Sequence, residues 1–162
     1  MIKKKKKKGF FSRTTKLFSG DKEIGFIKTD FWNQKAEGKI FDETYSFESR
    51  NWYSQDLDVY RKGQSEPIGL VKYRTWSSAM DLEFKDEKNA TLKPTNFWNS
   101  KWSLKTEDGT EVHYKGSSQK GSLEFPDTVS TTLLLVGIHA IHQSWQYAAA
   151  VAAIVAIIAS SS

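Results

Sequence analysis

The chain has 162 residues, enough for one ordinary domain with a sizeable core. It has no Cys, which excludes disulfides, thiolate metal sites and a cysteine nucleophile, whereas its six Trp, six Tyr and ten Phe favour half-buried strands over disorder. Six of the 24 basic residues are consecutive lysines near the start, which leaves 18 basic against 19 acidic residues. This neutral body argues against a nucleic-acid surface spread over the fold.

The first element is a run of six lysines, so residues 1–9 are expected to form a polybasic tail. The run consists of Lys3, Lys4, Lys5, Lys6, Lys7 and Lys8. It is either a solvated, disordered terminus or an attachment to an anionic membrane, worth about 1 kcal/mol per lysine near the lipid. Residues 12–16 are polar, so no signal peptide is predicted and this end is expected to stay in the cytosol.

A repeat follows the lysine run. Residues 24–32 read IGFIKTDFW and residues 68–76 read IGLVKYRTW, with Ile, Gly, Lys and Trp at the same internal spacing. Similarity at one fixed offset indicates a duplicated structural unit, with copies over 20–63 and 64–109. A partial third copy between 110 and 125 is left open.

Each copy has the period of β-strands. Apolar and polar residues alternate in Asp56–Arg61, Met80–Phe84 and Lys101–Lys105, which places one strand face inward and the other in water. Turn signals such as Lys62-Gly63 and Asp108-Gly109 recur at intervals typical of an antiparallel meander. We therefore predict about eleven or twelve short strands between residues 10 and 125, folded into a sandwich or barrel.

The last predicted element is an apolar helix. Residues 131–159 contain no charged residue and no Pro, which predicts one helix, or two in series, capped by Ser130 or Asp127. The segment exceeds the roughly 20 residues that span a bilayer. However, a polar stripe at i, i+3, i+4 and i+7 crosses its middle and would be costly in lipid. The stripe consists of His139, His142, Gln143 and Gln146.

Three placements of this helix are open. It could span a membrane, lie inside a barrel too wide for its own side chains to fill, or divide between the two. We expect a division at Trp145, with residues 133–145 completing the barrel. The Ala-rich residues 147–162 would then form a helical extension, whose part 147–159 is available to a membrane or to a protein partner.

Two β units followed by an apolar helix that begins Leu133-Leu134-Leu135-Val136-Gly137-Ile138 resemble the tubby C-terminal-like superfamily. That group includes tubby proteins, phospholipid scramblases and LURP-one-related proteins, and this chain is similar to a small bacterial-type member. The resemblance rests on architecture and not on a diagnostic motif. It implies a mainly β domain over 10–146, a closed antiparallel barrel of about twelve strands around a central C-terminal hydrophobic helix. It also implies binding of phosphoinositides or other anionic lipids.

Candidate lipid-binding residues are the lysine run together with Lys28, Lys72 and Arg74, which occupy equivalent strands of the two copies. Three tryptophans, Trp32, Trp76 and Trp98, lie at or beside the ends of repeat strands. They either form an aromatic belt at a membrane interface or pack in repeat-equivalent core or turn positions.

Catalytic and metal chemistry are not expected. His139 and His142 are three residues apart on the helix, but a third ligand would have to come from across the barrel, so hydrogen-bonded histidines are favoured over a metal site. Carboxylates such as Asp56 and Asp58 alternate with apolar residues, which predicts solvent-facing positions. The sequence therefore predicts no cofactor and no enzyme. It predicts a membrane-associated barrel that binds anionic phospholipid at the cytosolic membrane face; the alternative is a tail-anchored scaffold whose barrel binds a protein partner.

Overall fold

The structure is a computed structural model that describes residues 2–8, 12–30, 35–50, 55–74, 77–116 and 120–145. Within this part of the chain, twelve strands precede a helix over residues 131–145, so the prediction of a mainly β fold with one C-terminal helix is confirmed. The strands are β1 (Ile2–Lys8), β2 (Ser12–Ser19), β3 (Lys22–Asp30), β4 (Lys35–Ile40), β5 (Glu43–Ser49), β6 (Leu57–Arg61), β7 (Gly69–Tyr73), β8 (Met80–Phe84), β9 (Ala90–Pro94), β10 (Lys101–Thr106), β11 (Glu111–Gly116) and β12 (Lys120–Glu124).

Strands β2 to β12 form one antiparallel sheet in which each strand pairs with the next in the chain. Burial alternates along them, as in β4, where exposed and buried residues take turns from Lys35 to Ile40. Turns at Gly20, Gly63 and Gly109 have φ of 62°, 83° and 87°, a backbone conformation that glycine adopts without strain. The predicted antiparallel meander is therefore present.

The lysine run lies in strand β1 and not in a free tail. Its backbone pairs with β2 over Ile2–Lys8 and with β12 over Ile2–Lys5. The prediction of a polybasic tail at 1–9 thus differs from the structure, because backbone N–H and C=O groups that a tail would leave to water find partners in two neighbouring strands. Closure of the sheet into a barrel would depend on this strand alone, since only β1 lies between β12 and β2 in the strand order.

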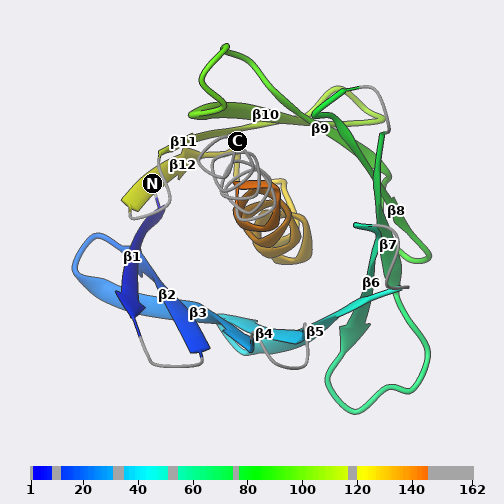
Figure 1. The fold of residues 1–162 in the computed structure, drawn as a ribbon, viewed down its shortest axis with the longest axis horizontal. Coiled ribbons are helices and arrows are strands. Elements are labelled where there is room, and N and C mark those ends of the chain that lie inside the picture. Colours follow the sequence, from blue (N-terminus) through cyan, green and yellow to red (C-terminus); the bar gives the residue numbers. More distant parts are fainter. Residues whose placement is uncertain are drawn as a thin grey trace, which may run out of the picture.

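The helix lies inside the curve of the sheet, where the strands surround it (Figure 1). From Thr132 to His142 every residue is buried, and the apolar ones share one core with inward side chains of the strands, among them Phe47, Leu92 and Trp102. A helix that is apolar nearly all round requires such an environment. No helix among the described residues combines the length and the hydropathy needed to cross a membrane. The predicted extension at 147–162 lies outside the described residues.

Hydrogen bonds fix the helix at several heights. Ser130 caps it, since its Oγ accepts from the backbone N–H of Leu133 at 3.2 Å, as one of the two predicted caps. Three tyrosines from three strands contact the helix by their hydroxyls: Tyr45 lies 2.6 Å from Thr132 Oγ1, Tyr73 donates to the carbonyl of Ala140 at 3.1 Å, and Tyr114 donates to the carbonyl of Leu134 at 3.4 Å. The position of the helix is therefore determined by polar contacts as well as by burial.

The two sequence copies contain equivalent strands. Residues 20–63 form β3 to β6 and residues 64–109 form β7 to β10. The repeated glycines occupy the same kind of position: a Cβ on Gly25 would lie 2.0 Å from the carbonyl oxygen of Lys39, and one on Gly69 would lie 2.5 Å from the ring of Phe84. Both copies thus use glycine where a neighbouring strand approaches closely.

Candidate functional site

The connections between strands alternate between two ends of the sheet, because consecutive strands run antiparallel. One end, the Trp145 rim, carries the β9–β10 connection (residues 95–100) and the last described residue of the helix. The other end, the Ser130 rim, carries the start of the helix and the β4–β5 turn with Phe41. The two rims differ in what they expose, and the Trp145 rim holds the candidate site.

The β9–β10 connection presents two aromatic side chains to solvent. Phe97 is 89 % exposed and Trp98 is 80 % exposed, and their rings meet edge to face with centroids 5.3 Å apart. Trp98 therefore does not pack in the core, and of the core or turn positions expected for it, it occupies a turn, where it contacts Phe97. Trp32 and Trp76, to which the same alternatives applied, lie outside the described residues. Adjacent exposed aromatics of this size are unusual on a soluble surface and indicate an interaction site.

Hydrogen bonds hold this connection in one conformation. The side-chain oxygen of Asn96 accepts from the backbone N–H groups of Ser100 (3.0 Å) and Lys101 (3.2 Å). Asn99 has a φ of 55°, in the left-handed region that Asn tolerates. Its carbonyl accepts from the indole N–H of Trp102 at 2.8 Å and from that of Trp145 at 2.9 Å. The exposed pair is thus carried by a turn that is braced on both the sheet and the helix.

Two lysines lie beside this turn without acidic partners. Lys101 on β10 and Lys115 on β11 are directly opposite each other in the register, and both are exposed. Like charges in directly opposite positions destabilise a sheet. Among the described residues, neither lysine forms an ion pair within 4.0 Å. This arrangement favours an anion as a ligand, because an anion would relieve the repulsion.

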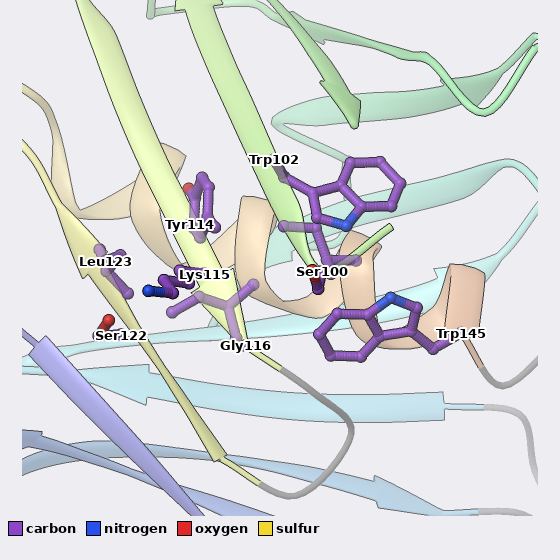
Figure 2. Close-up of a pocket in the computed structure, with 10 residues that line it drawn as sticks. Ser100, Trp102, Tyr114, Lys115, Gly116, Ser122, Leu123 and Trp145 are labelled. Carbon is purple, nitrogen blue, oxygen red and sulfur yellow. The ribbon is translucent and has the colours of Figure 1, made fainter. Parts of the chain in front are cut away.

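A small cavity lies under the turn, between the end of the helix and strands β10 to β12 (Figure 2). Its volume is about 10 Å³, room for roughly one water molecule. Its lining includes the apolar side chains of Trp102 and Trp145 and the polar side chains of Ser100, Lys115 and Ser122. Because the cavity is so small, the aromatic turn rests on a filled core, and its binding surface is the outside of the rim.

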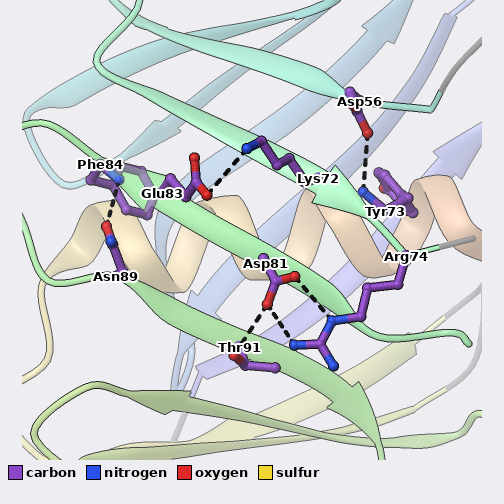
Figure 3. A network of polar contacts seen from close by, with 9 residues as sticks. All are labelled: Asp56, Lys72, Tyr73, Arg74, Asp81, Glu83, Phe84, Asn89 and Thr91. Carbon is purple, nitrogen blue, oxygen red and sulfur yellow. Dashed lines mark hydrogen bonds and ion pairs between the residues drawn. The ribbon is translucent and has the colours of Figure 1, made fainter.

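The predicted lipid-binding residues of the repeat do not come together. Lys28 is exposed on β3, whereas Lys72 on β7 and Arg74 directly after it lie four strands further along the sheet, roughly 19 Å away along its curve. Lys72 Nζ donates to Glu83 at 3.3 Å, and Arg74 donates to both carboxylate oxygens of Asp81, at 2.7 and 2.9 Å (Figure 3).

The hydrogen bond from Arg74 holds the pKa of Asp81 below its usual range, as expected for a charge that is already compensated. Equivalent positions of the repeat lie on different walls of the curled sheet, and lipid binding by Lys28, Lys72 and Arg74 stays a prediction. In the strand order, β2 alone lies between Lys28 on β3 and the lysine run, and β12 alone lies between Lys115 on β11 and the run, whereas Lys72 and Arg74 are several strands away from it on either side.

The histidines do not form a metal site in the described part of the chain, where no group of three His, Asp or Glu side chains could hold an ion. His139 is buried and stacks on Phe47 with centroids 4.3 Å apart, and its Nδ1 has no hydrogen-bond partner among the described residues. Burial lowers the pKa of His139 to about 4. The rings of His142 and Trp145 lie with centroids 5.6 Å apart and planes tilted by 30°, while His113 is exposed beside Glu111. These contacts are structural.

Sequence reasoning missed Phe97, Lys101 and Lys115. One signal could have identified the turn: the tripeptide Phe-Trp-Asn occurs at 97–99 and also at 31–33. The lysine pair needed the register, which no local pattern gives. No protein-family model matches this chain, and neither the curated proteins nor the solved structures include a match to it.

Proposed function

We propose that this chain is a non-enzymatic protein that docks its Trp145 rim onto an anionic membrane surface, from the cytosolic side. The observation that carries the proposal is the braced turn with exposed Phe97 and Trp98 beside the unpaired Lys101 and Lys115. Trp and other aromatic side chains favour the membrane–water interface, and lysines favour the anionic headgroups next to it. The exposed aromatic side chains and the lysines of this rim therefore lie next to each other, in an arrangement that suits the interface of an anionic bilayer.

The expected affinity is that of a reversible contact. Partial burial of two large aromatic side chains contributes on the order of 1–2 kcal/mol each, and two lysines contribute about 1 kcal/mol each. The sum of roughly 4–6 kcal/mol corresponds to a dissociation constant between about 1 mM and tens of micromolar. Further lysines of β1 would strengthen it. The chain leaves the described helix at this same rim, and residues 146–162 contain no charged residue, which supports the orientation.

The proposal includes the architecture. We take the sheet as a closed barrel of twelve strands, with β1 as the closing strand between β12 and β2, around the C-terminal helix. The strand order and the two registers of β1 support this closure. The similarity to the tubby C-terminal-like superfamily stays a prediction, and anionic-lipid binding is the function that this resemblance implies.

The test is co-sedimentation with vesicles of phosphatidylcholine, with and without phosphatidylserine. The double variant Phe97→Ala/Trp98→Ala should weaken binding to anionic vesicles about tenfold or more, because it removes roughly 1.4 kcal/mol or more of interfacial burial. Phe41→Ala is the matched control, since Phe41 is 52 % exposed on the Ser130 rim and should not matter.

Added salt should weaken the binding, because it screens exposed lysines. Equal recovery of the unmodified protein with neutral and anionic vesicles would contradict the electrostatic part. Unchanged binding of the double variant would contradict the rim as the docking surface.

A further inference from the structure

Basic side chains without acidic partners gather on one part of the sheet. Half of the described lysine and arginine side chains lie within 4.0 Å of a carboxylate. All 19 acidic side chains of the chain belong to the described residues, so the other half has no acidic side chain as a partner. Three of these unpaired lysines, Lys93, Lys101 and Lys115, lie near the Trp145 rim on β9, β10 and β11, and all three are exposed.

The register places these three lysines around one small residue. Ser103 on β10 lies directly opposite Lys93 on one side and directly opposite His113 on the other. Lys101, two residues before Ser103 on the same strand, lies directly opposite Lys115. Directly opposite side chains have Cβ atoms roughly 5 Å apart, and diagonal neighbours are roughly 7–8 Å apart. Each ammonium group, at the end of a flexible four-carbon stem, can therefore reach the space above Ser103.

Ser103 faces outward, because its neighbours Trp102 and Leu104 are buried in the core and successive strand residues point to opposite faces. It is nevertheless only 9 % exposed, since longer side chains surround it. Its hydroxyl supplies a hydrogen-bond donor at the centre of the three lysines. Like charges so close together repel each other. An anion between them would remove the repulsion and accept charge-assisted hydrogen bonds.

Carboxylates mark the edge of this group on the side away from the rim. Glu111 contacts His113 at 3.4 Å, and Glu124 lies directly opposite His113 on β12. Lys105 is exposed on the same face of β10, but it lies roughly 13 Å along the strand from Lys101 and directly opposite Glu111. Lys105 is therefore outside the group and serves as its matched control.

We propose that Lys93, Lys101 and Lys115 form, around Ser103, a binding site for a phosphate monoester group. Such a group carries about −1.5 to −2 charges at pH 7 and has three strong acceptor oxygens, which suits three ammonium groups. A phosphodiester, as in phosphatidylserine, has fewer charges and fewer free oxygens. The phosphate monoester comes either from phosphatidic acid in the bilayer or from a soluble phosphomonoester. The lipid source rests on the proposed function, since it places the site on the membrane that the Trp145 rim contacts.

Co-sedimentation with two kinds of vesicle tests the lipid source. One kind contains phosphatidic acid, and the other contains twice that fraction of phosphatidylserine, so that both have a similar total charge. The unmodified protein should bind the phosphatidic acid vesicles about fivefold or more tightly. Lys93→Ala should weaken this binding about tenfold and remove the preference, because it removes one charge-assisted hydrogen bond to the phosphate. Lys105→Ala should leave both affinities within about twofold.

Titration with glycerol 3-phosphate, followed by the amide NMR signals of Ser103 and His113, tests the soluble source without any membrane. Saturable shifts that Lys93→Ala abolishes, with no preference for phosphatidic acid vesicles, assign the site to soluble phosphomonoesters. A vesicle preference that depends on Lys93 assigns it to the lipid.

Absence of both effects overturns the proposal, and so does a preference or a shift that Lys93→Ala leaves intact. If the protein binds both kinds of vesicle equally well through Phe97 and Trp98 and glycerol 3-phosphate causes no shift, the docking rim stands and the phosphate site alone fails. If the protein binds no anionic vesicle, the proposed function fails, whereas the titration still decides whether the phosphate site exists.

Discussion

Gly137 lies in the middle of the helix, directly against the ring of Tyr114. A Cβ built on Gly137 would lie 2.2 Å from the hydroxyl oxygen of Tyr114 and 2.8 Å from the ring carbon that bears it. Real Cβ atoms do not approach other atoms so closely, so Gly137→Ala requires Tyr114 or the helix to move. Tyr114 is itself buried and donates a hydrogen bond to the carbonyl of Leu134, which leaves it little freedom.

Two opposing effects decide the sign of this substitution. In an isolated helix, alanine is favoured over glycine by about 1 kcal/mol. Inside the sheet, overpacking costs about 1–3 kcal/mol, and loss of the Tyr114 hydrogen bond adds about 1 kcal/mol. The packing effects are larger, so Gly137→Ala should lower the free energy of unfolding by roughly 1–3 kcal/mol, and Tm by several degrees.

Thermal and urea unfolding of Gly137→Ala measure this directly. Ser144→Ala is the control on the same helix, because Ser144 is only partly buried and should change stability by a few tenths of a kcal/mol in the stabilising direction. Added to Gly137→Ala, Tyr114→Phe should relieve only part of the clash. It removes the hydroxyl oxygen at 2.2 Å, but the ring carbon at 2.8 Å remains. If Gly137→Ala instead stabilises the protein, the helix does not lie against Tyr114, and its placement inside the sheet is refuted.

Three further predictions follow from the contacts. Lys101→Ala should weaken binding to anionic vesicles about fivefold, which corresponds to the contribution of one lysine near lipid. Arg74→Ala should change the binding by no more than about twofold, because Arg74 is already paired with Asp81. A larger effect of Arg74→Ala would indicate that the sheet docks through the side that carries Arg74 and not through the Trp145 rim. His139 has a folded pKa of about 4 against 6.5 unfolded, so unfolding measured against pH should show full stability above pH 6.5 and a loss of roughly 3 kcal/mol by pH 4. His139→Leu should flatten this profile; an unchanged slope would assign it to other groups. Gly25→Ala should cost roughly 2–4 kcal/mol of unfolding free energy, and a near-neutral result would contradict the close approach of β4.

The meander and the helix could be predicted from the sequence because both are recorded in local periodicity. Burial in β8 follows the alternation of Met80–Phe84, with Met80 and Leu82 inside and Glu83 outside. The start of the helix follows from Ser130, whose side chain satisfies an N–H group that the helix leaves unpaired. These features depend on neighbours within a few residues, so no knowledge of the distant chain is needed.

The lysine strand and the candidate site depend on distant partners instead. Six lysines have low strand preference and read as a tail, yet β1 pairs with β12, whose residues are more than a hundred positions later in the sequence. Phe97 and Trp98 are large and apolar, which by composition suggests the core; only the turn held by Asn96 places them outside. Lys28 and Lys72 look equivalent in the repeat, but the curl of the sheet separates them.

The docking rim can be tested most directly by attaching an environment-sensitive NBD fluorophore to a single engineered cysteine. Phe97→Cys places the label on the Trp145 rim and keeps Trp98, and Phe41→Cys places it on the Ser130 rim. With phosphatidylserine vesicles, the label at 97 should shift to the blue, brighten and be quenched by brominated lipids, while the label at 41 should not respond. A silent label at 97, or an equal response at 41, would contradict docking through the Trp145 rim.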